Sequence, residues 1–81
     1  MSNSLSERVY EASVPYLGPA AMVFLKRQTA THMGGLNFEQ ITLTDLPELL
    51  GWILISGRLL IGPKADDLVG KLQNEFNVRL Q

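Results

Sequence analysis

The chain has no cysteine and only one histidine among its 81 residues. Without cysteine it can form no disulfide, no thiol nucleophile and no cysteine-ligated zinc site. Small secreted domains usually depend on disulfides, so their absence favours a reducing compartment, and we expect a cytoplasmic protein. With His32 as the only imidazole, the sequence offers no nucleophile–base pair and no cluster of metal ligands. We therefore expect no enzymatic activity, no metal and no cofactor.

The chain also has no marked excess of charge of either sign. Seven basic and eight acidic residues give a net charge of −1, and no run of like charges occurs. Nucleic-acid-binding domains normally carry a concentrated basic patch, so we do not expect nucleic acid as a partner. The closest approach to such a patch would be four cations that could meet if the ends of their helices lie together: Lys26, Arg27, Arg58 and Lys64.

The longest apolar stretch is too short to span a membrane. It is "DLPELLGWILISGRLLI", residues 45–61, with Glu48 near its start and Arg58 near its end. Its apolar part rises about 24 Å as a helix, against about 30 Å of hydrocarbon in a bilayer. We therefore predict a buried helix here and no membrane span.

Helical signals cover most of the remaining sequence. Ser4 and Glu7 have the spacing of a capping box, and the helix that they start should end or kink near Val14, because Pro15 follows. A second helix is expected over 19–32, with an apolar, buried first half and a polar, exposed second half. The last helix has a one-sided apolar stripe, formed by Leu68, Val69, Leu72 and Phe76.

Two short segments share the pattern [Leu/Ile]-Gly-Pro-x-Ala, at 17–21 and at 61–65. Proline is favoured at the first position of a helix and glycine is acceptable before it, so we interpret both segments as helix starts. The sequences around them do not align further, and we do not interpret them as an internal repeat.

The connector at 36–43 is ambiguous. It fits either a helical turn capped by Asn37 or a short extended segment. In both cases four apolar side chains should hold it against the core: Leu36, Phe38, Ile41 and Leu43. Thr42 or Thr44 should then cap the following helix.

These elements predict an all-α fold. We expect one domain over 1–81, a small bundle of about four helices with an apolar central helix at 45–61, and disorder at 1–4.

The helix at 45–61 carries two apolar stripes on opposite sides. The broad stripe consists of Leu46, Leu49, Leu50, Ile53, Leu60 and Ile61. The second consists of Trp52, Ile55 and Leu59, with Gly51 beside it. One helix can bury two faces either at the centre of the monomer or by meeting another protein. We predict that the second stripe is an interaction surface through which the chain forms a homodimer or binds a protein partner.

The segments "PYLGPAAMVFLKRQ" and "LTDLPELLGWILISGRLLIGPKADDLVGKL" resemble a loosely defined group of short helical bacterial domains of unknown function. Members of this group stand alone or are appended to signalling proteins, and the Leu/Ile-Gly-Pro-x-Ala start is their most recognisable feature. The resemblance covers about residues 14 to 76. It implies a regulatory or scaffolding role in bacterial signalling, and it transfers no catalytic residue.

The function expected from the sequence is thus a non-enzymatic protein–protein interaction or regulatory module that self-associates. Two alternatives remain open. One is a small helical nucleic-acid-binding regulator that uses the four cations named above. The other is a carrier of a small apolar ligand, held between the second and third helices near Phe24, Met22 and Trp52.

Overall fold

The structure, a computed structural model, describes residues 4–80. Within them the chain forms four α-helices and two short 3-10 helices, and it forms no strand. In chain order the elements are α1 (Leu5–Leu17), η1 (Gly18–Ala20), α2 (Ala21–His32), η2 (Phe38–Gln40), α3 (Leu46–Ile61) and α4 (Lys64–Phe76). None of the helices described is long and apolar enough to cross a membrane.

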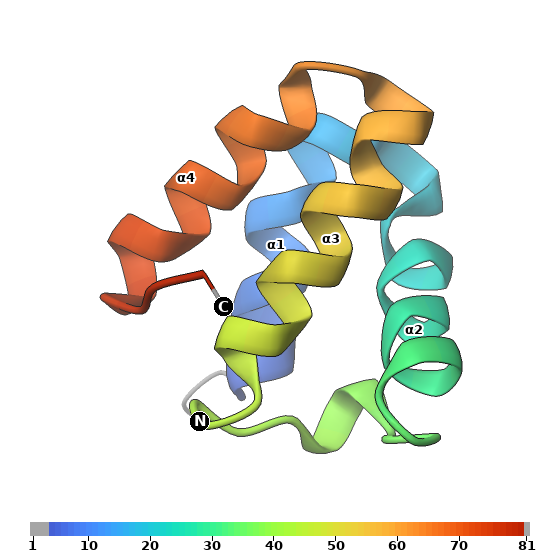
Figure 1. Cartoon of the computed structure of the whole chain (residues 1–81), viewed down its shortest axis with the longest axis vertical. Coiled ribbons are helices and arrows are strands. Elements are labelled where there is room, and N and C mark those ends of the chain that lie inside the picture. The colour runs from blue at the N-terminus through green and yellow to red at the C-terminus, as the bar shows by residue number, and fades with distance from the viewer. Residues whose placement is uncertain (1–3, 81) are drawn as a thin grey trace.

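Neighbouring helices run in opposite directions (Figure 1), and they pack as a ring in which α1 contacts α2 and α4 while α3 contacts α2 and α4. Their inner faces form one apolar core with Phe38 and Ile41 of the connector. The predicted all-helical fold is confirmed. A bundle of about four helices describes it only roughly, because η1 and η2 also pack against α1 and α2.

The start of α1 follows the prediction, and its end does not. Ser4 and Glu7 form the capping box, with N–H to side-chain oxygen distances of 2.9 and 3.2 Å. Of the four residues expected to be disordered, Ser4 is therefore an ordered cap, and the other three lie outside the described residues. The predicted end near Val14 is wrong, since α1 continues through Pro15 to Leu17. The carbonyl that loses its donor is that of Glu11, and both Glu11 and Pro15 are exposed.

The expected division of α2 into a buried and an exposed half is also wrong. Val23 in the first half is 63% exposed, whereas Gln28 and Thr29 in the second half are buried. Helical periodicity explains both departures, because only one face of α2 meets the core along its whole length. The helix begins at Ala21, two residues later than expected, because Pro19 lies in the preceding 3-10 turn.

The ambiguous connector contains a helical turn. The side chain of Asn37 accepts a hydrogen bond from the amide of Glu39 at 2.9 Å, which starts η2, and Phe38 and Ile41 are buried as expected. Leu43, expected against the core, is 57% exposed. Neither predicted threonine caps α3, since Asp45 occupies the N-cap position. The Asp45 carboxylate instead accepts from the amide and the hydroxyl of Thr42.

One face of α3 lies in the core and the opposite face does not. Four residues of the predicted broad stripe are fully buried: Leu46, Leu49, Leu50 and Ile53. Leu60, assigned to the same stripe, is 59% exposed. The helix lies between α2 and α4 and is not enclosed, so its description as central holds only for its inner face.

The two Gly-Pro segments make the same turn. Gly18 and Gly62 both have φ of 63°, with ψ of −146° and −138°. Each glycine donates its amide N–H to the carbonyl four residues earlier, on Val14 and on Arg58. An L side chain is strained at such a positive φ, which explains the glycine in both turns. The chain therefore folds as two helical hairpins, α1–α2 and α3–α4, with the same reversal.

The two hairpins also bury matching positions. Gly18 and Gly62 lie 44 residues apart, and residues at the same spacing are buried together. The matched pairs are Ser6 and Leu50, Val9 and Ile53, Ser13 and Gly57, Ala21 and Ala65, Phe24 and Leu68, Leu25 and Val69, and Gln28 and Leu72. The sequences of the two hairpins do not align, yet these positions are buried in both, since burial depends on helix geometry and tolerates very different side chains.

The closest approach between α3 and α4 depends on Gly57. A Cβ at this position would lie 3.0 Å from the Cβ of Ala65, which is fully buried and cannot rotate away. We expect Gly57→Ala to lower the free energy of unfolding by about 1–3 kcal/mol, because the two helices must separate. A Cβ at Gly70, inside α4, would meet no neighbouring atom within 4 Å. Gly70→Ala should raise the same quantity by about 0.5–1 kcal/mol.

Urea unfolding followed by circular dichroism measures both changes. Equal stabilisation by the two substitutions would show that α3 and α4 do not meet at Gly57.

Candidate functional site

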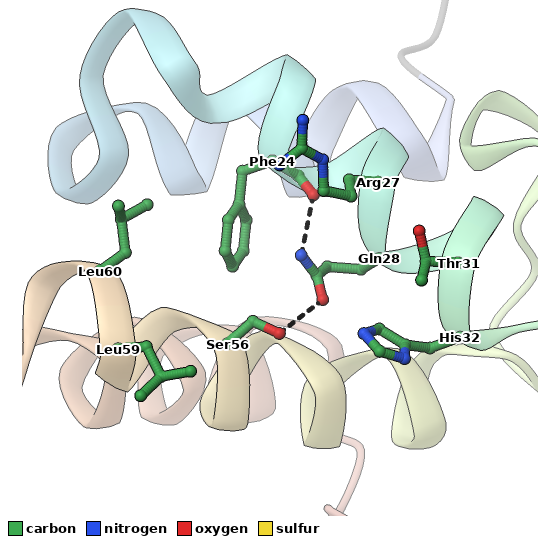
Figure 2. Close-up of a pocket in the computed structure, with 8 residues that line it drawn as sticks. All are labelled: Phe24, Arg27, Gln28, Thr31, His32, Ser56, Leu59 and Leu60. Atoms are coloured by element: carbon green, nitrogen blue, oxygen red, sulfur yellow. Dashed lines mark hydrogen bonds between the residues drawn. The ribbon is translucent and has the colours of Figure 1, made fainter.

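A pocket of about 290 Å³ lies between α2 and α3. Figure 2 shows the side chains of both helices that face it. At one end they are apolar, and at the other they are polar. The complete lining is Phe24, Arg27, Gln28, Thr31, His32, Ser56, Leu59 and Leu60.

The floor of the pocket contains a buried amide. Gln28 is only 3% exposed, although its side chain is polar. Its Nε2 donates to the Phe24 carbonyl at 3.2 Å, and its Oε1 accepts from the Ser56 hydroxyl at 2.8 Å (Figure 2). The contact with Ser56 joins α2 to α3 across 28 residues of sequence. Burying an amide is favourable only when it is hydrogen-bonded, so this pair positions the two helices relative to each other.

The polar end of the pocket is closed by a stacked pair of rings. His32, from the last turn of α2, lies 4.1 Å from the ring of Trp52 on α3, centroid to centroid, with an angle of 9° between the ring planes. The indole Nε1 of Trp52 also donates to Glu48 at 3.4 Å. These two contacts fix the Trp52 side chain, which is partly buried.

The predicted interaction residues lie on one side of α3. Ile55 is 56% exposed and Leu59 is 88% exposed, while Trp52 and Gly51 are partly exposed. A shallow hollow of about 200 Å³ is lined by Glu48, Gly51, Trp52 and Ile55. Leu59 is one of the predicted interaction residues and also lines the 290 Å³ pocket, so the predicted interaction surface and the pocket adjoin along α3.

Two of the four predicted cations form ion pairs. Lys26 lies 3.9 Å from a carboxylate oxygen of Glu39, and Arg58 lies 2.8 Å from one of Asp66. These ion pairs draw Lys26 towards η2 and Arg58 towards α4. Lys64 is exposed at the start of α4. Arg27 forms no ion pair with any residue in 4–80, and it is the only one of the four that lines the pocket.

The alternative of a ligand site between the second and third helices named one lining residue correctly. Phe24 lines the pocket, whereas Met22 does not, and Trp52 contributes only through its contact with His32. Sequence reasoning missed Gln28, Thr31 and Ser56. A usable signal was present, because residues 24, 27, 28 and 31 follow the i, i+3, i+4, i+7 spacing of one helix face.

Comparison with known protein families, with curated proteins and with solved structures finds no significant match to this chain. In the part of the chain that the structure describes, no group of three or more His, Asp or Glu side chains could hold a metal ion. The function must therefore be inferred from the molecule's own surface.

The contribution of the Gln28–Ser56 pair to stability can be tested by substitution. The replacements are the residue types found 44 positions away, which are leucine, as at Leu72, for Gln28 and alanine, as at Ala12, for Ser56. Ser56→Ala leaves the Gln28 oxygen without a donor and should lower the free energy of unfolding by about 1–3 kcal/mol. The double variant Gln28→Leu/Ser56→Ala should recover most of that loss, because no buried polar atom is left unpaired.

Urea unfolding of the wild type, both single variants and the double variant gives the coupling energy as a double-mutant cycle. Additive losses in the double variant would contradict a direct Gln28–Ser56 interaction.

Proposed function

We propose that the protein is a non-enzymatic interaction module that self-associates through the outward face of α3. The observation that carries this proposal is the exposure of Ile55 and Leu59 on one side of a helix whose other side forms the core. Contiguous apolar surface with an aromatic residue is typical of protein–protein interfaces. The lack of cysteine and the resemblance of the Gly-Pro segments favour a regulatory role in the bacterial cytoplasm.

The first hairpin supports the proposal by contrast. At the 44-residue spacing, the outward positions of α1 that correspond to Gly51, Trp52, Ile55 and Leu59 are Glu7, Arg8, Glu11 and Pro15. All four of these are exposed, and three carry charge. The same position in the fold is therefore solvated in one hairpin and apolar in the other. Three large apolar side chains side by side are unusual on a helix face that only contacts water.

The energetics permit a dimer. Full burial of each large apolar side chain contributes roughly 1.5–3 kcal/mol. The outward faces of two α3 helices, each with Trp52, Ile55 and Leu59, therefore offer on the order of 10 kcal/mol of binding free energy. Association costs roughly 4–15 kcal/mol in lost translational and rotational freedom. Because both copies use the same helix face, the expected assembly is a twofold-symmetric dimer.

The decisive experiment compares two exposed apolar residues with matched accessibility. Ile55 is 56% exposed on the α3 face and Leu43 is 57% exposed in the connector. We expect the wild type to be a dimer at micromolar to millimolar concentration, and Ile55→Glu to be a folded monomer, because it buries a charge in the interface. Leu43→Glu should remain dimeric. Sedimentation equilibrium gives the mass, and circular dichroism shows whether each variant is folded.

A monomeric wild type would disprove self-association. Unfolding of Ile55→Glu alone would show that Ile55 supports the monomer and not an interface. Equal dissociation of both variants would show that net charge, and not the α3 face, controls the assembly.

A further inference from the structure

The matching of the two hairpins provides an internal comparison for the pocket. If α1 corresponds to α3 and α2 to α4, then the groove between α2 and α3 corresponds to the groove between α4 and α1. Both pairs of helices are in contact. The side chains between α4 and α1 can therefore be compared, position by position, with those that line the pocket between α2 and α3.

Two cation–ring contacts connect α1 and α4. The Nζ of Lys71 lies 6.0 Å from the ring centroid of Tyr16, at the outer limit of a cation–π contact. The guanidinium of Arg8 lies 4.6 Å from the ring centroid of Phe76, and it forms an ion pair with Glu75 at 3.8 Å. Each cation between these helices thus lies over or near a ring, and Glu75 offsets the charge of Arg8.

The pocket between α2 and α3 keeps part of this arrangement. His32 and Trp52 stand at the positions of Phe76 and Arg8, and they also stack. Arg27 stands at the position of Lys71 and is likewise a cation. One end of each groove is therefore closed by a stacked pair of side chains, and each groove has a cation at the matching position, Arg27 or Lys71.

Two groups are missing from the pocket. Leu60 stands at the position that corresponds to Tyr16 of α1, and Thr31 stands at the position that corresponds to Glu75 of α4. No aspartate or glutamate lines the pocket, and Arg27 has neither a carboxylate nor an aromatic partner among residues 4–80. Relative to its counterpart, the pocket lacks one aromatic ring and one carboxylate.

The floor of the pocket is polar where its counterpart is apolar. Gln28 and Ser56 replace Leu72 and Ala12. The Gln28 amide carries two N–H donors, and one hydrogen bond from its Nε2 is formed, to the Phe24 carbonyl. A buried amide with a donor to spare is costly in a purely structural core and useful in a ligand site.

We propose that this pocket binds a small aromatic carboxylate. The ring occupies the space beside Phe24 and Leu60, and Leu60 stands at the position that corresponds to Tyr16. The carboxylate binds near Arg27 and Thr31, which lie one turn apart on the same face of α2. The pocket volume of about 290 Å³ is at the small end of the range for ligand sites, which suits a single ring with a short acidic chain.

The site is complete within one chain, so it does not depend on the proposed dimer. Leu59 belongs both to the pocket and to the α3 face, and the binding experiment is therefore performed on the wild type and on Ile55→Glu. Ile55 does not line the pocket, so the second protein separates ligand binding from self-association.

The probes are 3-phenylpropionate, 3-phenylpropanol, which lacks the charge, and 3-cyclohexylpropionate, which lacks the aromatic ring. Titration is followed by ¹H–¹⁵N NMR and by the fluorescence of Trp52, the only tryptophan, which contacts His32 of the pocket. We expect 3-phenylpropionate to shift the Gln28 side-chain amide and the backbone amides of Thr31 and Ser56. Both other probes should bind at least about fivefold more weakly, because each lacks one of the two missing groups.

Three variants locate the site. Arg27→Gln should reduce the affinity for 3-phenylpropionate to that for the alcohol, whereas Lys26→Gln, which removes an adjacent cation outside the pocket, should leave it unchanged. Leu60→Tyr should abolish binding, because it places a ring at the position that corresponds to Tyr16. Leu60 is 59% exposed, so this substitution is compatible with folding.

The proposal is overturned if 3-phenylpropionate causes no saturable shift up to about 10 mM, which corresponds to a very weak site. Equal affinity for all three probes, or undiminished binding to folded Leu60→Tyr, would also overturn it. A wild type that fails to dimerise but binds the acid would leave this inference standing and remove only the proposed self-association.

Discussion

Both halves of the molecule depend on a glycine with a left-handed backbone. Gly18 and Gly62 reverse the chain with the same φ of 63°, and each amide closes the last turn of the helix before it. The proline that follows lacks an amide hydrogen and cannot extend the earlier helix, but it can begin the next turn. These two reversals set which faces of α1 and α2, and of α3 and α4, meet.

In the second hairpin, Gly57 and Ala65 flank the turn at Gly62, and a Cβ at Gly57 would lie 3.0 Å from the Cβ of Ala65. In the first hairpin the corresponding positions are Ser13 and Ala21, both also fully buried, and the Ser13 hydroxyl is satisfied by the Val9 carbonyl at 2.8 Å. A chain of this length buries a modest core, so tight helix packing is a larger share of its stability than in a bigger domain.

The two hairpins differ mainly in what they present outward. The outer face of α1 carries charges, while that of α3 carries Ile55 and Leu59. The ring of Tyr16 lies near Lys71 of α4, while the groove between α2 and α3 is open above Gln28 and Ser56. The apolar outer face belongs to α3 alone, whereas the pocket takes its walls from α2 of the first hairpin and α3 of the second. Because the backbone plan is shared, the differences reflect side-chain chemistry and not the demands of folding.

Local signals in the sequence determined the capping box at Ser4, both helix starts at Gly-Pro and the buried stripes of α3 and α4. Each depends on residues within one or two turns of one another, and helical spacing is visible in a sequence. Tertiary structure decided that α1 passes through Pro15, that Gln28 is buried, and that Leu43 and Leu60 are exposed. Those outcomes depend on which helix lies opposite, and residues far apart in the sequence supply it. The pocket itself required α2 and α3 to pack side by side, because no single segment of the chain contains both of its walls.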